Sequence, residues 1–372
     1  MKDLLKNLIT AAPTLENGEY NAAAVLLNYF QQHGIPVQID LWDHNRANVI
    51  ASIGQQKPDI PALVIGAHID VVPANSQQWT TEPFKPVEKD GKIYGRGAAD
   101  MLGGLCAAAD AMRQIFCEKK DLKGRVILAA TAGEETDSCG VKRFVETVRQ
   151  NISNVIGILI PEPTDLKIMR AHRGILWVKI ETFGKTAHGS MPHLGINAIR
   201  KMNELLNHIE KWAIPHIPHP LLGGCSVSPN RIMGGSATNI IPDKCTLELD
   251  IRTLPNQEHQ DIVKLIESML DQVKAVDPDF EASVSILRTC PSMETPEDNP
   301  FIQTVCRASG TAKTYAAGFT TDGPLFAQLS KSIVILGPGD STLCHKPNEY
   351  IGINELKKAK ELYQKIICNL FI

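Results

Sequence analysis

The sequence predicts an α/β fold in which a mainly parallel sheet is interrupted by an inserted α+β part. In the first half of the chain, short aliphatic runs alternate with helical patterns, which is typical of parallel sheets with right-handed crossovers. From about Gly174 the segments become longer and alternate polar with apolar residues, as antiparallel strands with one wet face do. After residue 288 the α/β pattern returns. We therefore expect one domain at 1–172 and 289–372 and an inserted domain at 173–288.

The elements of the first domain follow from periodicity. Apolar residues recur at helical spacing in the helices, and short β-branched and aliphatic runs mark the buried strands. In chain order we expect helices at 2–10 and 17–33, strands within 37–53, a strand at 63–65, an irregular loop at 71–92, a helix at 103–116, a strand at 125–132, a helix at 140–150, a strand at 155–160, a helix at 300–309, a strand at 333–336 and a helix at 353–370. The long loop is of a kind that is usually functional in compact domains.

The inserted domain is expected to be a small α+β unit. Alternating segments at 176–180, 245–252 and 282–287 indicate strands, and two amphipathic patterns at 197–212 and 258–273 indicate helices. Two helices would then cover one face of an antiparallel sheet.

Composition narrows the class of protein. A chain of 372 residues with 43% hydrophobic residues can bury a sizeable core and form two domains. Its net charge of -3, with mixed signs, gives no electrostatic footprint for nucleic acid or an anionic membrane, so we expect a small-molecule partner. Nine cysteines without a Cys-x-x-Cys pair indicate reduced thiols. With neither a signal peptide nor a membrane span indicated, we expect a cytoplasmic protein.

Histidine and acidic residues follow several of the predicted buried strands. The carboxyl ends of such strands meet at the edge where α/β sheets bind ligands. The candidates are His68, Asp100, Glu134, Glu135, Glu162 and His345, with Asp70 placed to orient His68. Two imidazoles and several carboxylates suit two zinc ions or a similar divalent pair, with one carboxylate bridging. Neighbouring residues on extended backbone diverge, so one residue of the Glu134–Glu135 pair would be a ligand and the other a general base.

Taken singly, each candidate is more often structural. A histidine at a strand end is usually a satisfied core or surface residue, a Glu-Glu pair is usually solvated, and Glu162 between two prolines is compatible with a simple turn. Their coincidence at four predicted strand ends favours a metal site.

Four segments carry a resemblance to a known family. They are His68-Ile69-Asp70-Val71-Val72-Pro73, Tyr94-Gly95-Arg96-Gly97-Ala98-Ala99-Asp100-Met101, Gly133-Glu134-Glu135 and Pro161-Glu162-Pro163-Thr164. Together they resemble the signatures of the zinc-dependent amidohydrolase family that includes acetylornithine deacetylase, succinyl-diaminopimelate desuccinylase, aminoacylase and carboxypeptidase G. The likeness extends over nearly the whole chain, through Gly337-Pro338-Gly339 to His345.

The resemblance implies a role for each candidate. One zinc would be held by His68, Asp100 and Glu162, and the other by Asp100, Glu135 and His345, with Co²⁺ as a substitute metal. Glu134 would be the general base that takes a proton from water and returns it to the departing amine, and Asp70 would orient His68. The resemblance also implies a cis peptide between Asp100 and Met101.

The inserted domain is implied to form a homodimer and to act as a lid. His188, in Thr186-Ala187-His188-Gly189, would reach the partner's active site and stabilise the oxyanion; the alternative is an ordinary surface histidine. The resemblance places Asn239, Arg252, Gly318 and Thr320 near the substrate. Arg252 fits a carboxylate grip and a structural ion pair equally well.

The function implied is removal of the acyl group from an N-acyl amino acid, with deacetylation of N-acetylornithine in arginine biosynthesis as the first choice. The alternatives are a succinyl-diaminopimelate desuccinylase and a metallo-dipeptidase or carboxypeptidase. A different class, a non-catalytic metal-binding relative, is disfavoured because every ligand and the base Glu134 are present.

Overall fold

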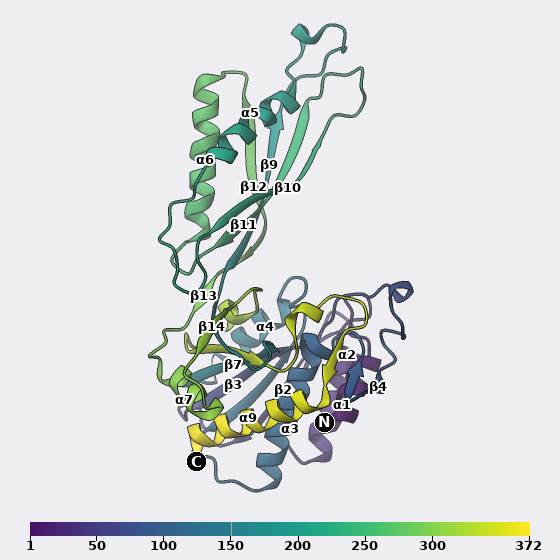
Figure 1. The fold of residues 1–372 in the computed structure, drawn as a ribbon, viewed down its shortest axis with the longest axis vertical. Coiled ribbons are helices and arrows are strands. Elements are labelled where there is room, and N and C mark those ends of the chain that lie inside the picture. The colour runs from purple at the N-terminus through teal and green to yellow at the C-terminus, as the bar shows by residue number, and fades with distance from the viewer. Residues whose placement is uncertain (150) are drawn as a thin grey trace. The chain divides into compact units, whose positions relative to one another are not determined.

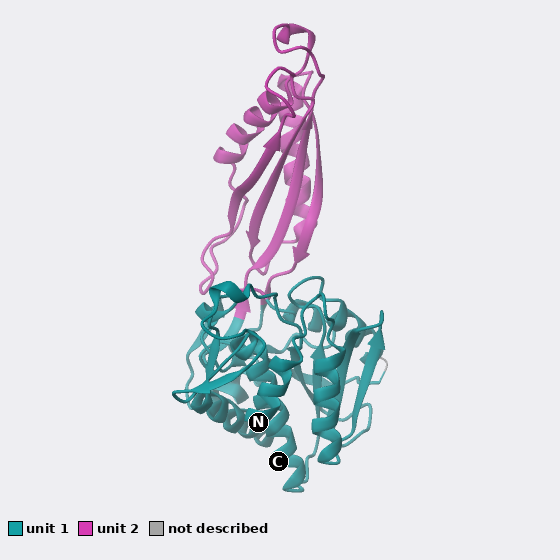
Figure 2. Ribbon diagram, turned by 90° about the vertical axis from the view of Figure 1, so that its right-hand side faces the viewer, with its two compact units in different colours: residues 1–170, 294–317, 321–372 teal, residues 171–293, 318–320 magenta. Residues whose placement is uncertain are grey.

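The computed structural model describes residues 1–149 and 151–372 and divides into two compact units, shown in different colours in Figure 2. Unit 1 contains residues 1–170, 294–317 and 321–372, and unit 2 contains residues 171–293 and 318–320. Unit 1 holds a mixed, mainly parallel sheet and unit 2 a separate antiparallel sheet, so the predicted fold class is confirmed. Within the described ranges, no helix has both the length and the apolar content needed to cross a membrane.

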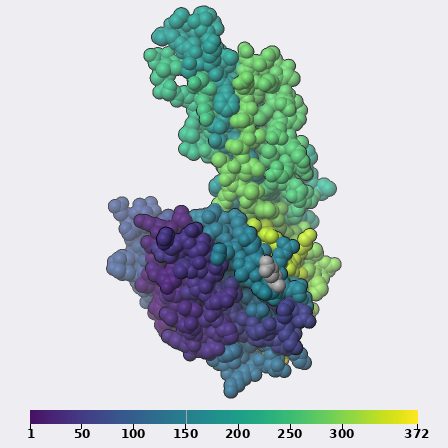
Figure 3. All heavy atoms as spheres, turned by 180° about the vertical axis from the view of Figure 1, so that it is seen from behind, coloured from purple at the N-terminus to yellow at the C-terminus, as the bar shows by residue number. Residues whose placement is uncertain are grey.

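Unit 1 opens and closes with helices, and its N-terminal residues form a continuous purple area of the face seen in Figure 3. Its elements are α1 (Lys2–Thr10), α2 (Tyr20–Gln32), β1 (Val37–Trp42), β2 (Arg46–Gly54), β3 (Ala62–His68), β4 (Val87–Lys89), β5 (Lys92–Tyr94), α3 (Gly103–Cys117), β6 (Arg125–Thr131), α4 (Cys139–Val148), β7 (Val155–Pro163), α7 (Pro300–Ser309), β14 (Thr314–Ala317), α8 (Gly323–Phe326), β15 (Ile333–Gly337), β16 (Tyr350–Gly352) and α9 (Ile353–Phe371). The short strands β8 (Ile168–His172) and β13 (Met293–Glu294) lie where the two units divide.

The large sheet has the strand order β1-β2-β6-β3-β7-β15-β8-β13. Strands β6, β3, β7 and β15 run parallel, as the strand-helix-strand pattern predicts. The connections from β3 to β6 and from β6 to β7 run in opposite directions along the sheet, so right-handed crossovers place α3 and α4 on opposite faces. Helix α9 lies beside α3 (Figure 1). The sheet is therefore covered on both sides, and every residue of β3 is buried.

The carboxyl ends of three neighbouring strands meet at one edge of this sheet. His68 ends β3, the Gly133–Glu135 segment follows β6, and Glu162 lies near the end of β7. Because β3 pairs with both β6 and β7, this topology brings together side chains that are far apart in the sequence.

Two expectations in unit 1 need correction or restriction. Residues 71–92 are not wholly irregular, because β4 pairs with β5 in a hairpin and β5 pairs with β16. The hairpin turn is Asp90-Gly91, with φ values of 52° and 72°, a sequence that favours this turn type. The helix expected at 140–150 is α4, and its expected last residue, Gln150, lies outside the described residues.

Unit 2 consists of β9 (Gly174–Phe183), α5 (Ala198–Lys211), β10 (Ser226–Gly234), β11 (Lys244–Thr253), α6 (His259–Val276) and β12 (Glu281–Cys290). Its sheet has the order β10-β11-β9-β12, and buried residues alternate with less buried ones along β9 and β11. Both helices contribute apolar residues to a common core with that sheet. The strand β10 was not expected, because Pro229 and Asn230 interrupt an exposed edge strand whose register shifts between Pro229 and Arg231.

Candidate metal centre

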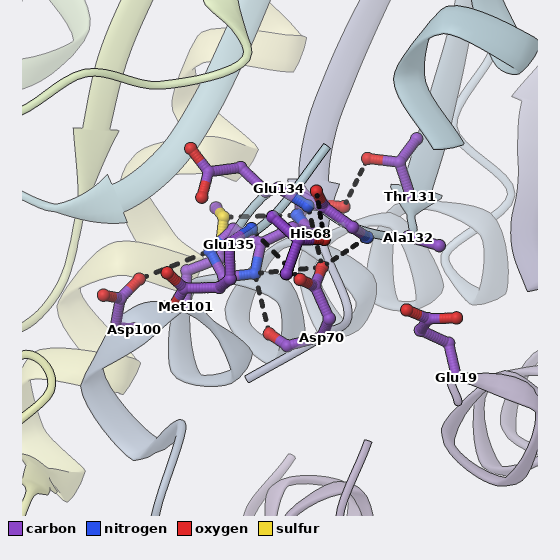
Figure 4. A network of polar contacts seen from close by, with 12 residues as sticks. Glu19, His68, Asp70, Asp100, Met101, Thr131, Ala132, Glu134 and Glu135 are labelled. Carbon is purple, nitrogen blue, oxygen red and sulfur yellow. Dashed lines mark hydrogen bonds and ion pairs between the residues drawn. The ribbon is translucent and has the colours of Figure 1, made fainter. Parts of the chain in front are cut away.

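His68 ends the fully buried strand β3, and its side chain is buried with it. Its Nδ1 lies 2.9 Å from the backbone carbonyl of Asp70, and because a carbonyl only accepts, Nδ1 donates in this contact. The opposite ring atom, Nε2, faces two carboxylates, with Asp100 Oδ1 at 3.3 Å and Glu162 Oε1 at 3.5 Å. The backbone of Asp70 thus aims Nε2 of the ring at the candidate ligands (Figure 4).

The carboxylate of Asp70 has a different set of partners. Its Oδ1 accepts hydrogen bonds from the backbone N–H groups of Gly133 at 2.8 Å and Glu134 at 3.1 Å, and its Oδ2 accepts from Glu135 at 3.1 Å. The same Oδ1 lies 3.7 Å from His68 Nδ1. Gly133 adopts φ +82°, which glycine tolerates readily, so the chain turns sharply after β6. Asp70 therefore fastens the turn that presents Glu134 and Glu135.

Asp100 lies between two histidine-carboxylate pairs. Its Oδ1 faces His68, while its Oδ2 lies 3.3 Å from Nε2 of His345. That same nitrogen lies 3.0 Å from Oε1 of Glu135. The peptide bond from Asp100 to Met101 is cis, in agreement with the expectation from the resemblance. One carboxylate thus offers each of its two oxygens to a different cluster, which is the arrangement of a bridging ligand.

Two glutamates at this edge are held in a poorly solvated environment. Burial raises the pKa of Glu134 well above its ordinary range, although the nearby His68 opposes the shift. Burial likewise raises the pKa of Glu162, and the negative charge of Asp100 adds to the effect. The site therefore concentrates more negative charge than its solvation supports, which favours a bound cation.

The two imidazoles respond to this excess of negative charge. Hydrogen bonds to Asp100 and Glu135 raise the pKa of His345 to about 10. Burial lowers the pKa of His68, but its hydrogen bond to Asp100 and the charge of Glu162 outweigh burial and raise it well above the usual value. Each ring thus tends to hold a proton as counter-charge, and a divalent ion would take the place of these protons.

The donor set fits a metal ion. His68, Asp100 and Glu135 each offer one donor atom, and these atoms lie within 4.8 Å of one another. Imidazole nitrogen and carboxylate oxygen are the ligands that zinc and related divalent ions take in proteins. The residues expected to complete two such sites are Glu162, which faces His68, and His345, which faces Glu135.

The remaining expected residues lie in unit 2. His188 is exposed, its Nδ1 lies 2.8 Å from Ser190 Oγ, and its backbone pairs with Ile240. Asn239 is exposed on the adjoining segment, where its carbonyl accepts from the N–H of Gly189. Gly318 and Thr320 also group with this unit.

Arg252 forms an ion pair within its own strand. Its Nε lies 2.8 Å from Oδ1 of Asp250, and its Nη2 donates to Oδ2 of Asp250 at 2.9 Å. The structure thus contains the ion pair that was one of the two alternatives for this residue.

Two buried residues beside the proposed metal ligands were not among the sequence candidates. Arg96 lies within the segment that leads to Asp100, and Glu349 follows His345 by four residues. They form an ion pair of 2.7 Å. The available signal was a charged residue close to each of two proposed ligands, but nothing in the sequence indicates that the two charges meet.

Comparison with known proteins agrees with this geometry. The model of peptidase family M20/M25/M40 matches residues 64–369. A curated relative from Pectobacterium carotovorum subsp. carotovorum (strain PC1), named acetylornithine deacetylase, is 32% identical over 365 residues, covering 95% of this chain and 91% of the relative.

Two solved structures share the fold across both units. One is the aminopeptidase PepT from Bacillus cereus ATCC 10987, with a TM-score of 0.80 and 21% identity, covering 99% of this chain and 97% of the other. The second is the YXEP protein of Bacillus subtilis, described as a dinuclear metal-binding peptidase, with a TM-score of 0.74 and 19% identity, covering 99% of this chain and 98% of the other. The family model matches most of the chain, and a partly buried His/Asp/Glu cluster lies at its sheet edge, so this chain belongs to peptidase family M20/M25/M40 and is a metal-dependent hydrolase.

Proposed function

We propose that the protein removes the acyl group from an N-acyl amino acid, with N-acetylornithine as its substrate, using two zinc ions. The position of Asp100 between His68 and His345 is the observation that carries the proposal, because it supplies a bridging carboxylate for two cations. The name of the Pectobacterium relative supports the choice of substrate. The dinuclear description of the Bacillus subtilis protein supports the number of ions.

The ions, when bound, supply Lewis-acid chemistry that polarises the scissile carbonyl and acidifies water. One would lie among His68, Asp100 and Glu162, and the other among Asp100, Glu135 and His345. Asp70 supports both sites, because its backbone aims His68 and its carboxylate fixes the turn that carries Glu135.

Glu134 is the proposed general base. Burial raises the pKa of Glu134, so its carboxylate is a stronger proton acceptor than an exposed glutamate. It takes a proton from the water whose oxygen bonds to the amide carbon. As the carbon-nitrogen bond breaks, the same proton passes from Glu134 to the departing amine, so a single carboxyl group serves first as base and then as acid.

Unit 2 would contact the substrate and would form the interface with a second subunit. Strand β10 lies at the edge of its sheet, with Ile232 and Met233 exposed at 53% and 48%. Such an edge can pair with a second copy of the chain. In the proposed homodimer, His188 of one subunit stabilises the oxyanion formed in the active site of its partner.

Four residues of unit 2 are proposed to contact the substrate: Asn239, Arg252, Gly318 and Thr320. Arg252 already pairs with Asp250, so it would have to share or exchange this partner to hold a substrate carboxylate.

A substrate panel combined with metal analysis tests the proposal. Purified protein is loaded with Zn²⁺ or Co²⁺ and assayed on N-acetylornithine, succinyl-diaminopimelate and a set of dipeptides. The highest kcat/KM is expected for N-acetylornithine, with two ions bound per chain. A preference for either of the other substrates would reassign the substrate class, and two bound ions without turnover of any of them would make the protein a binding module.

A further inference from the structure

Glu349 as a whole residue is only 1% exposed, and its carboxylate accepts four hydrogen bonds. Its Oε2 accepts from Arg96 Nη1 at 2.7 Å and from the N–H of Gly97 at 3.1 Å. Its Oε1 accepts from the N–H of Ala99 at 2.8 Å and of Asp100 at 3.1 Å. The last of these donors is the backbone of the proposed bridging ligand, so Glu349 fixes the chain at the residue whose side chain lies between the two clusters.

Arg96 extends these contacts to a second proposed ligand. Its Nη2 donates to the carbonyl of His345 at 3.3 Å, and its Nη1 contacts the carbonyl of Lys346 at 3.4 Å. His345 adopts φ +63°, a left-handed conformation that residues other than glycine rarely occupy. Its imidazole is about half exposed, so the packing of the side chain alone holds it weakly. The contact from Arg96 therefore supports an unfavourable backbone conformation at a metal ligand.

The Arg96–Glu349 pair thus links the backbones of Asp100 and His345. The two segments also meet outside the pair, because the N–H of Gly95 donates to the carbonyl of Glu349 at 3.0 Å and β5 pairs with β16. The ion pair lies deeper than this ladder, with side-chain exposures of 4% for Arg96 and 0% for Glu349.

An ion pair buried to this degree adds little net stability to a fold. Removing both charges from water costs several kcal/mol per ion, and an apolar pair of similar volume often does as well. The backbone donors and carbonyls that surround the two charges indicate instead that they fix one arrangement of the two segments. Residues that hold metal ligands in position through hydrogen bonds commonly alter the affinity of a site for its metal.

We propose that Arg96 and Glu349 form a positioning unit that sets the distance and direction between Asp100 and His345, and so raises the affinity of the site for its second cation. The pair itself contacts neither substrate nor metal. This inference rests on the proposed two-metal function, and its test therefore begins with metal binding by the unaltered protein.

The first variant is Glu349→Gln, which keeps the shape of the side chain. The amide nitrogen, however, brings two N–H donors toward the Arg96 and backbone N–H groups, which are donors themselves. We expect the dissociation constant of the more weakly bound Zn²⁺ ion, measured by competition with a chromophoric chelator, to rise about 10- to 100-fold. The rise in melting temperature on adding a fixed Zn²⁺ concentration should shrink accordingly. Asp110→Asn is the matched control, because Asp110 is also buried and pairs with an arginine, Arg113, but lies in helix α3 away from the ligands.

Arg96→Lys keeps the charge and provides a second variant if Glu349→Gln does not fold. Lysine lacks the two Nη groups that contact the carbonyls of His345 and Lys346. This variant should therefore bind Zn²⁺ more weakly than the wild type, whereas the Asp110→Asn control should not. Equal Zn²⁺ affinity in the wild type and in either folded variant would overturn the positioning role. The same affinity loss in Asp110→Asn would overturn it too, by reducing the effect to general destabilisation. A wild type that binds no second ion would instead refute the proposed two-metal function.

Discussion

Nε2 of His345 lies 3.0 Å from Oε1 of Glu135, although 210 residues separate them in the sequence. The same nitrogen lies 3.3 Å from Oδ2 of Asp100, whose other oxygen faces His68. The acidic cluster therefore closes only when the C-terminal segment returns to the sheet edge formed by β3, β6 and β7. If the cluster binds metal as proposed, we expect metal binding to stabilise the fold of unit 1, because the ligands come together only in the folded chain.

Replacing Glu134 by alanine should remove turnover without removing metal. The residue is assigned as a base and not as a ligand, so loss of its carboxylate should lower kcat by about 100- to 10,000-fold while the zinc content stays at the wild-type level. Metal analysis and steady-state kinetics on the same sample give both values. Glu135→Ala is the matched comparison and should lose zinc. A Glu134→Ala protein depleted of zinc would mean that Glu134 is itself a ligand.

Asp70→Asn should loosen the turn after β6. The amide keeps one accepting oxygen but cannot accept from both sides, so one of the three backbone N–H groups loses its partner. A buried donor left unpaired costs about 1–3 kcal/mol, and the zinc bound through Glu135 should be held less tightly. Urea unfolding and chelator competition measure the two effects. Asp340→Asn, which caps a short exposed turn through a single N–H of Thr342, should change neither; an equally mild Asp70→Asn would contradict the role of Asp70.

Most residues of the candidate cluster could be selected from the sequence because they follow strands that are recognisable locally. Strands β3 and β6 are short aliphatic runs, and parallel topology alone brings His68 and the Glu134–Glu135 pair to one edge. The Arg96–Glu349 pair was out of reach, because the two residues are 253 positions apart and the turn they fix is irregular. Strand β10 was missed for a different reason: an exposed edge strand needs no apolar alternation, and its proline resembles a loop signal.

His172 should make the protein less stable in mild acid. Burial lowers the pKa of its imidazole to about 4, compared with 6.5 for the unperturbed group. The unfolded chain thus binds a proton more readily than the folded one between these values. The contribution of neutral His172 to the free energy of unfolding is fully present above pH 6.5. It is lost as the pH falls toward 4, which lowers the free energy of unfolding by an amount on the order of 3 kcal/mol.

The measurement is the melting temperature between pH 7 and pH 4 for the wild type and His172→Gln. The variant should show a shallower loss in this window, while His44→Gln, at an exposed histidine, controls for the removal of an imidazole. Parallel wild-type and His172→Gln curves would show that His172 does not contribute to the acid sensitivity.

His188→Ala should lower kcat by about 100-fold if its imidazole stabilises the oxyanion. The dimer allows a sharper test, in which inactive His188→Ala and Glu134→Ala proteins are mixed under conditions that exchange subunits. A hybrid dimer then has one site that combines an intact Glu134 with an intact His188 from the partner. We expect recovery of about a quarter of the wild-type activity, since about half of the dimers are hybrids with one complete site each. No recovery after verified exchange would mean that His188 does not act across subunits.

Substitution of the β10 edge should separate the subunits. Ile232→Lys combined with Met233→Glu places charges on the exposed edge that is proposed to pair. Light scattering should then show a monomer that retains its zinc, because the ligands belong to unit 1, but that has low turnover. A dimer that persists in this variant would place the subunit interface elsewhere.

The zinc content of Asp100→Asn, compared with the wild type, tests the central claim most directly. Asp100 is the only residue assigned to both ions, and an amide offers one accepting oxygen where the carboxylate offers two. At saturating Zn²⁺ followed by removal of free metal, the wild type should hold two zinc ions per chain and Asp100→Asn fewer than one. Two ions retained by a folded Asp100→Asn protein, or a single ion in the wild type, would contradict the bridging role of Asp100.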